Sequence, residues 1–215
     1  KELTALNYYT NEEITIPLDP TQTPGENAQR YFAKYNKQKR TFEALTELIQ
    51  ETADDIQYLE SISNALDIAL SEADLAQIKE ELMQSGYIRR KHTKKKVKLT
   101  SKPMHYISSD GYDMYVGKNN LQNEELTFSF ANGNDWWFHA KGAPGSHVIV
   151  KSGGDELPDR TFEEAGRLAA YYSKNRGADK VEIDYIQKKH VKKPNGAKPG
   201  FVVYYTNYSL VIDSD

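Results

Sequence analysis

The chain has 215 residues, of which 38% are hydrophobic and 27% are charged, and its formal net charge is −3. This length and composition are typical of a water-soluble globular protein with one or two domains. The absence of cysteine excludes disulfides, thiolate zinc sites and thiol catalysis. No apolar run approaches the ~20 residues of a membrane-spanning helix.

Charge is strongly segregated along the chain. Residues 43–81 carry eleven acidic side chains and one basic one, whereas residues 86–102 carry eight basic side chains and no acidic one. A second block, residues 188–200, holds five lysines and one histidine, again without an acid. Because a local basic patch attracts polyanions even on an acidic chain, these blocks favour contact with nucleic acid.

The first part of the chain predicts a strand-and-loop lead-in, residues 1–22, and then a helical arm. Thr23 and Glu26 have the spacing of a helix start with a capping box. Between residues 35 and 66, apolar side chains recur at alternating spacings of three and four, which is the pattern of a coiled coil. The arm is therefore expected to begin with one long helix.

A shorter helix is expected after the long one. Ser71 and Asp74 form a second capping box, and Gly86 is a typical stop signal. The helical arm therefore spans residues 23–86. At ~1.5 Å per residue the second helix is about half as long as the first. It cannot cover the whole apolar seam, so the sequence predicts that another segment, or a second copy in a dimer, covers the rest.

After a basic linker, residues 87–102, the hydrophobic period changes to two, which is typical of strands. One helix interrupts the strands, capped by Thr161 and ended by Gly177. The predicted fold class is α+β: a helical coiled-coil arm followed by a mostly β domain, residues 103–215, with one packed helix. The expected strands are Met104–Ser108, Asp113–Val116, Leu126–Phe130, Trp136–His139, His147–Val150, Lys180–Ile186, Phe201–Tyr205 and Ser209–Ile212.

The densest chemistry lies in "NDWWFHAKGAPGSHVIV", residues 134–150. His139 and His147 with Asp135 are possible zinc ligands, and Asp135, His139 and Ser146 are the residue types of a hydrolytic triad. The chain has neither the HExxH zinc motif nor a GxSxG nucleophile elbow. The sequence therefore favours structural or RNA-facing histidines and predicts no metal, no cofactor and no catalytic residue.

The two tryptophans in this stretch are adjacent, so on a strand they point to opposite faces of the sheet. One of Trp136 and Trp137 should enter the core. The other either packs beneath a loop or stays exposed as a stacking surface for a nucleobase.

The two basic blocks supply the candidate phosphate contacts. Such contacts are sensitive to salt and independent of base sequence. A solvated lysine-rich linker is the alternative interpretation of the first block. The predicted RNA-binding residues are Arg89, Arg90, Lys94, Lys95, Lys96, Lys188, Lys189, Lys192 and Lys193.

Four ordered stretches resemble the NFACT-R domain of the RqcH/NEMF family: "YVGKNNLQNEELTF", "NDWWFHAKGAPGSHVIV", "AGRLAAYYSKNRGADKVEIDY" and "KKPNGAKPGFVVYY". The segments "ITIPLDPTQTPGENAQRYFAKYNKQKR" and "DLAQIKEELMQSGYI" are similar to the end of that family's coiled-coil arm. The residues that carry the central motif are Asp135, Trp136, Trp137, His139, Gly145, Ser146 and His147.

The resemblance implies a cytoplasmic, ribosome-associated quality-control factor. Members of this family bind the large ribosomal subunit carrying a stalled peptidyl-tRNA, recruit alanyl-tRNA and promote untemplated alanine tailing. The expected partners are therefore rRNA of the large subunit and tRNA. Since the ribosome forms the peptide bond, the family implies a binding protein and no enzyme.

An adhesin is the alternative function, because bacterial members were long named fibronectin-binding protein A. That reading expects fibronectin as the partner and a pool of the protein at the cell surface. The sequence itself supplies no sorting motif and no fibronectin-binding repeat.

Overall fold

The computed structural model describes residues 1–89 and 100–213. The chain divides into two compact units, residues 1–55 and 56–215, and each is described by itself. Within the described ranges no helix is long and apolar enough to cross a membrane.

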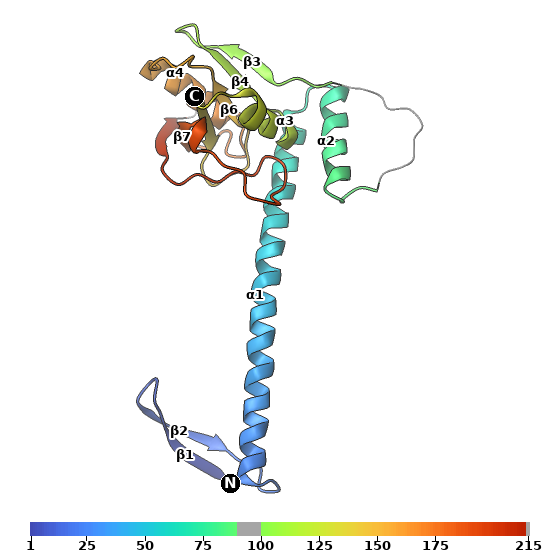
Figure 1. Ribbon diagram of the computed structural model, residues 1–215, viewed down its shortest axis with the longest axis vertical. Helices are drawn as coiled ribbons and strands as arrows, with labels where there is room; N and C mark the ends of the chain where they lie inside the picture. Colours follow the sequence, from blue (N-terminus) through green and yellow to red (C-terminus); the bar gives the residue numbers. More distant parts are fainter. Residues whose placement is uncertain (90–99, 214–215) are drawn as a thin grey trace. The chain divides into compact units, whose positions relative to one another are not determined.

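The first unit consists of a β-hairpin and the first part of a long helix, α1 (Figure 1). β1 (Glu2–Asn7) pairs antiparallel with β2 (Glu12–Pro17). α1 (Pro24–Ile68) begins at the predicted capping box. The carboxylate of Glu26 accepts the backbone N–H of Thr23 at 2.7 Å, and the Thr23 hydroxyl accepts the backbone N–H of Glu26 at 3.3 Å.

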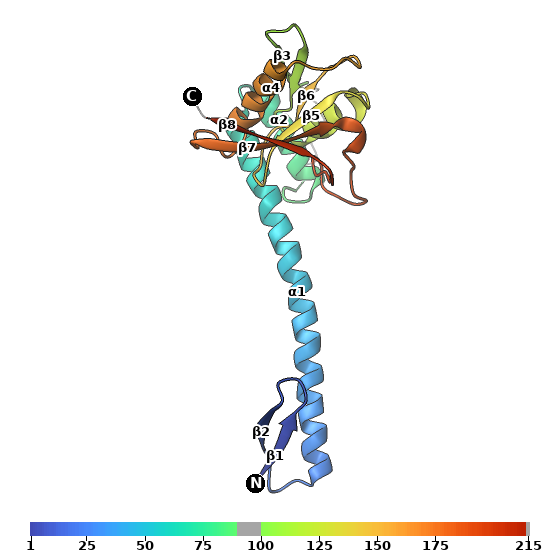
Figure 2. The ribbon, with the colours of Figure 1, turned by 90° about the vertical axis from the view of Figure 1, so that its left-hand side faces the viewer.

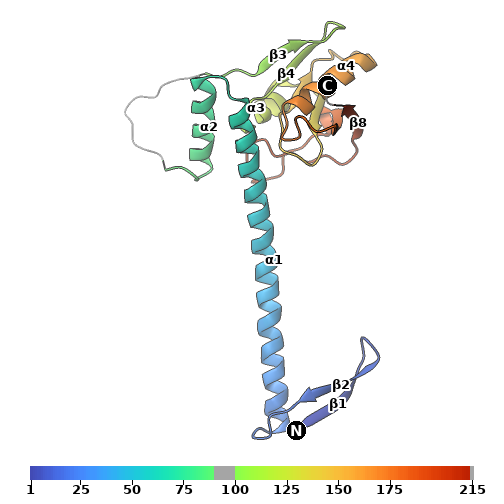
Figure 3. The ribbon, with the colours of Figure 1, turned by 180° about the vertical axis from the view of Figure 1, so that it is seen from behind.

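The apolar seam of α1 is exposed along this first unit. The second helix, α2 (Glu72–Gln84), lies beside only the end of α1, which belongs to the second unit (Figure 3). Tyr58 and Ile62 pack there against Ile78 of α2. The expected shortfall of the short helix is confirmed, while a dimer stays a prediction. The exposed side chains of the seam in the first unit are Phe32, Tyr35, Phe42, Leu45, Leu48 and Ile49.

The second unit is built around one antiparallel sheet of six strands. Their order is β3-β4-β6-β5-β7-β8, so β3 and β8 are the edge strands. Together with the helical arm, this sheet confirms the predicted α+β fold class. The strands are β3 (Met104–Ile107), β4 (Asp113–Val116), β5 (Trp136–Ala140), β6 (Val148–Val150), β7 (Lys180–Gln187) and β8 (Tyr208–Asp213).

One face of the sheet packs against α4 (Asp159–Tyr171). Ala165 and Ala169 are fully buried in this layer, as the helical spacing predicts. Gly166 allows the close approach, because a Cβ there would lie 2.8 Å from Cδ1 of Leu210 on β8. A side chain at this position would have to displace the ends of the Leu210 and Ile212 side chains on β8.

The opposite face is covered by α3 (Asn120–Glu125), by η1 (Leu126–Phe130), which continues α3, and by the loop between β7 and β8. Leu126 and Val191 pack there against Trp137 and Ile149 of the sheet. Both faces of the sheet are therefore covered, each by its own apolar layer.

The predicted strand Leu126–Phe130 is wrong, because these residues form the π-helical turn η1. The alternation of Leu126, Phe128 and Phe130 imitates a strand. The helix capped by Asn119 nevertheless runs on, since Leu126 and Thr127 are buried against the sheet.

Three further predictions are corrected. Residues 201–205 form no strand, because Val203 makes only an isolated bridge with Lys192 in the irregular loop. Thr161 does not cap α4, which begins after Pro158. The buried Thr161 hydroxyl instead donates to Asp110 at 2.8 Å, and α4 ends at Tyr171, ahead of the predicted stop at Gly177.

Candidate nucleic-acid interface

The two histidines of the central motif meet on the face of the sheet that carries α3. Their rings lie 5.4 Å apart, edge to face, and both contact the ring of Trp137. Nδ1 of the buried His147 lies 2.8 Å from the Thr127 hydroxyl and 3.2 Å from the Asn123 carbonyl. The backbone carbonyl oxygen of Asn123 can only accept a hydrogen bond, so Nδ1 of His147 carries the proton.

Burial keeps both rings neutral. It lowers the pKa of His139 to about 4, outweighing a hydrogen bond to the Gly145 backbone and the attraction of Asp184. Burial also lowers the pKa of His147, and the neighbouring His139 lowers it further. Among the described residues no three His, Asp or Glu side chains gather as metal ligands. The pair therefore acts as packed aromatic side chains.

Asp135 and Ser146, two residues of the conceivable hydrolytic triad, make contacts with other residues and not with each other. Asp135 accepts from Lys151 Nζ at 2.5 Å and from the backbone of Asn132 at 2.7 Å. Ser146 is buried, its backbone N–H donates to the Tyr172 carbonyl, and its hydroxyl has no hydrogen-bond partner among the described residues. The geometry therefore supports no acid–base–nucleophile relay through these residues.

The two tryptophans lie on opposite faces, as predicted. Trp137 is fully buried. Trp136 is half-buried on the α4 face, where Phe162 meets it edge to face with ring centroids 4.8 Å apart. Neither ring is a free stacking surface, because Trp137 is buried and Phe162 of α4 covers part of Trp136.

The motif "GKNNLQN" joins α2 to the sheet, a role that sequence reasoning missed. Asn120 Nδ2 donates to Glu81 at 2.8 Å, and the Asn119 side chain donates to Gln77 at 2.9 Å. Lys118 forms a partly buried ion pair with Asp74, N to O 3.1 Å. The signal in the sequence was a run of amides too rich for an exposed turn, facing a helix with several polar residues.

This α2–α3 network shifts the pKa values of two buried carboxyls in opposite directions. Burial disfavours the Asp74 carboxylate, but hydrogen bonds from Ser101, the Leu70 backbone and Lys118 prevail and lower its pKa to about 2. Burial raises the pKa of Glu81 despite its bonds to Asn120 and Tyr58. One oxygen of Glu81 has no partner within the described part of the chain.

The basic candidates fall into three groups. Arg90, Lys94, Lys95 and Lys96 lie outside the described residues. Arg89, Lys189 and Lys192 are exposed. Lys188 is half-buried, with its Nζ 5.9 Å from the centre of the Phe128 ring.

Lys193 helps to hold in place the basic loop, which is residues 188–200 between β7 and β8. Its Nζ lies 2.7 Å from a Glu124 carboxylate oxygen that also accepts the Gly200 backbone N–H at 3.2 Å. Five residues further along the loop, Lys198 Nζ donates to the Tyr87 hydroxyl at 2.9 Å and lies 4.6 Å from the Tyr58 ring centre. The loop is thus held at Lys193 and at Lys198 to Gly200, and Lys189 and Lys192 are exposed on the segment before these contacts.

Comparison with known families divides the chain into two matches. Residues 1–101 match "NFACT N-terminal and middle domains", and residues 102–205 match "NFACT protein RNA binding domain". The matches are contiguous and define the chain as part of an NFACT protein.

Individual relatives show to which family of NFACT proteins the chain belongs. "Rqc2 homolog RqcH" of Streptococcus pneumoniae serotype 2 is 47% identical over 97% of this chain, and the protein of the same name from Bacillus subtilis is 42% identical over 100% of it. The chain covers 38% of the length of each. The chain belongs to the RqcH/NEMF family.

A solved structure has the same fold. It is "The structure of the C-terminal of the fibronectin/fibrinogen-binding protein from Streptococcus suis (FBPS)". The two are 44% identical with a TM-score of 0.81, and the match covers 91% of this chain and 78% of that chain.

Proposed function

We propose that the chain is the RNA-binding part of a ribosome quality-control factor. The observation that carries the proposal is the match of residues 102–205 to the RNA-binding domain, combined with a basic loop that is held by contacts of Lys193 and Lys198 and exposes Lys189 and Lys192. In this role the loop binds rRNA or tRNA phosphates on a large ribosomal subunit that carries a stalled chain. Arg89 and the basic residues that follow it in the sequence are further candidate phosphate contacts.

The whole protein is proposed to recruit tRNA and promote untemplated alanine tailing at the C-terminus of the stalled chain. For this chain we propose no catalytic role, because the ribosome supplies peptide-bond formation. The names of the relatives support the quality-control role. The central motif, whose histidines and aspartate pack within the structure, supports the proposal that this chain has no catalytic role. The site of action is the cytoplasm.

Co-sedimentation with isolated large ribosomal subunits tests the proposal. Lys189→Glu and Lys192→Glu should each weaken binding about tenfold or more, because each removes a phosphate contact and adds repulsion. Lys180→Glu, which reverses an exposed lysine at the other end of β7, is the matched control and should bind within about twofold of the unchanged chain. Equal effects of the three substitutions would contradict the assignment of the interface.

Fibronectin binding is a second candidate, favoured by the likeness to the Streptococcus suis structure named for that activity. Solid-phase binding of the chain to immobilised fibronectin, at physiological salt, tests it. Saturable binding that Lys189→Glu leaves unchanged would support a separate matrix-binding role. Binding that disappears with salt in parallel with RNA binding would reduce it to non-specific charge attraction.

A further inference from the structure

A row of aromatic rings crosses three neighbouring strands on the α4 face of the sheet. Phe138 of β5 lies directly opposite Tyr185 of β7, which lies directly opposite Tyr208 of β8. Successive ring centroids are 5.5 Å apart, with interplanar angles of 16° and 27°. The three rings, here called the aromatic ladder, are stacked with an offset, which is a favoured arrangement of aromatic pairs.

The ladder is covered at one end and open at the other. Phe162 of α4 packs against Phe138 and Tyr185, with ring centroids 5.8 and 5.3 Å away. Tyr208 lies on the edge strand and is 61% exposed. Figure 2 shows β7 and β8 side by side at the margin of the sheet. The stack therefore ends in a ring whose outer side faces solvent.

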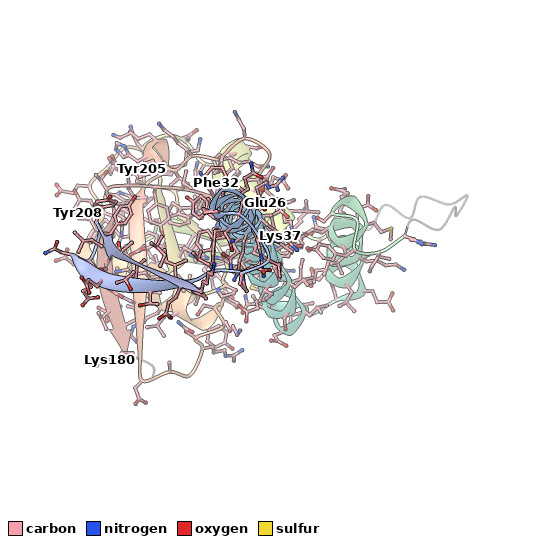
Figure 4. All side chains as sticks on the ribbon, turned by 90° about the horizontal axis from the view of Figure 1, so that it is seen from below. Glu26, Phe32, Lys37, Lys180, Tyr205 and Tyr208 are labelled. Atoms are coloured by element: carbon pink, nitrogen blue, oxygen red, sulfur yellow. The ribbon has the colours of Figure 1, made fainter. Side chains whose placement is uncertain are left out.

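The open end lies near the anchored basic loop. β7 ends two residues after Tyr185, at Gln187, and Lys188 and Lys189 follow immediately. At ~3.3 Å per residue, Lys188 is roughly 10 Å along the chain from the ladder. Figure 4 shows Tyr205 and Tyr208 at the same end of the sheet, away from Lys180 at the start of β7. A flat aromatic surface and cations thus occupy the same margin.

Charge decides on which side a polyanion passes. Asp159, at the start of α4, is close enough to Tyr185 to contribute, after burial and Tyr208, to the raised pKa of that phenol. This carboxylate repels phosphate from the α4 side of the ladder. The exposed Lys189, which follows β7, attracts phosphate, so a nucleic-acid backbone would follow the β8 edge towards Lys189.

From this juxtaposition we infer that the chain binds single-stranded RNA by stacking an unpaired base on Tyr208. The base becomes the fourth ring of the aromatic ladder, while a neighbouring phosphate contacts the exposed Lys189. The inference rests on the proposed RNA-binding function and adds a substrate preference, because a duplex keeps its bases stacked on each other and unavailable.

The test measures fluorescence anisotropy of three labelled probes with the 215-residue chain: a ten-nucleotide oligouridylate, an abasic strand of equal length, and a blunt RNA duplex. Tyr208→Ala should weaken binding of the oligouridylate about 5- to 30-fold, the range expected for losing one base–aromatic stack. Binding of the abasic strand and the duplex should change less than about twofold, because neither offers an unpaired base.

Two substitutions are the controls. Tyr208→Phe keeps the ring and should bind all three probes like the unchanged chain. Tyr205 is 83% exposed at the same margin, and no ring contact of it is recorded within the described ranges, so Tyr205→Ala should have little effect. Thermal unfolding of each variant shows whether the edge strand stays folded.

The outcomes separate the two proposals. Unchanged oligouridylate binding by Tyr208→Ala, or an equal loss in Tyr205→Ala, overturns the stacking inference and points to a peptide at this edge strand instead. If Lys189→Glu still weakens all three probes in that case, the proposed RNA-binding function stands. If neither tyrosine nor lysine substitutions change binding of any probe, both proposals fail.

Discussion

At the scale of single residues, the central motif shows that the surroundings of a histidine, and not only its residue type, determine its role. His139 and His147 have the residue type and proximity of a catalytic or metal-binding pair, with rings 5.4 Å apart. Their environment decides otherwise, since burial against Trp137 suppresses protonation of both. The consequence is a dependence of stability on pH that a reactive surface histidine would not produce.

The free energy of unfolding should fall as the pH drops below 6.5. Both histidines have a lowered pKa in the folded chain, so the unfolded chain binds more protons between pH 6.5 and about 4, and acid favours it. Urea unfolding at pH 7 and pH 5 should differ by about 1–3 kcal/mol. His147→Gln should flatten this profile. The exposed His190→Gln should leave the profile parallel to that of the unchanged chain, and a parallel profile for His147→Gln would contradict the assignment.

Adjacent lysines of the basic loop should differ in their salt response. Lys192 is exposed, whereas Lys193 is paired with Glu124 at 2.7 Å. Lys192→Gln should reduce the slope of log K for RNA binding against log salt by about 0.7–0.9, the value for one phosphate contact. Lys193→Gln should leave the slope nearly unchanged. Titrations of both variants at four salt concentrations measure this, and equal slopes would show that Lys193 leaves Glu124 for the RNA.

At the scale of secondary-structure elements, α2 is joined to the sheet through polar contacts as well as apolar ones. Asp74 is almost fully buried, and its partner Lys118 is only 16% exposed. Removing one member of such a pair leaves a charge without compensation in a poorly solvated place.

Asp74→Ala should therefore lower the free energy of unfolding by about 3–5 kcal/mol. Glu182→Ala is the matched control: it breaks the pair between Lys141 and Glu182, whose side chains are about half exposed, and should cost about 0–1 kcal/mol. Chemical denaturation of the two variants gives the comparison. Similar losses would mean that water reaches the Asp74 pair.

Elements with strong local signals could be predicted from the sequence, and those fixed by tertiary packing could not. The capping boxes at Thr23 and Ser71 are local, and both form as expected. Residues 126–130 alternate like a strand, yet burial of Leu126 and Thr127 holds them in η1. For the candidate site, the motif and the lysines were visible in the sequence. The ion pair of Lys193 and the aromatic ladder depend on residues far apart in the chain.

At the scale of the whole molecule, the exposed seam of α1 has consequences in solution. Phe42 and Ile49 are 72% and 67% exposed on a helix whose spacing is that of a coiled coil. The chain alone should associate at micromolar concentrations, because pairing two seams removes apolar surface from water. Sedimentation velocity should show a concentration-dependent dimer. Phe42→Asp with Ile49→Asp should be monomeric, whereas Lys34→Asp on the same helix should still associate.

The contacts of α2 set where this protein can be divided. The two family matches meet between residues 101 and 102, yet Gln122 of α3 bonds to Gln77 and Ser101, and Lys174 pairs with Glu60 of α1 at 2.6 Å. Separating the two parts of the chain at that junction would leave buried amides of α3 without their hydrogen-bond partners. The end of the arm and the sheet should therefore unfold as one cooperative unit. Their amides should exchange hydrogen at a common rate under mildly destabilising conditions, across a boundary that sequence families treat as a border.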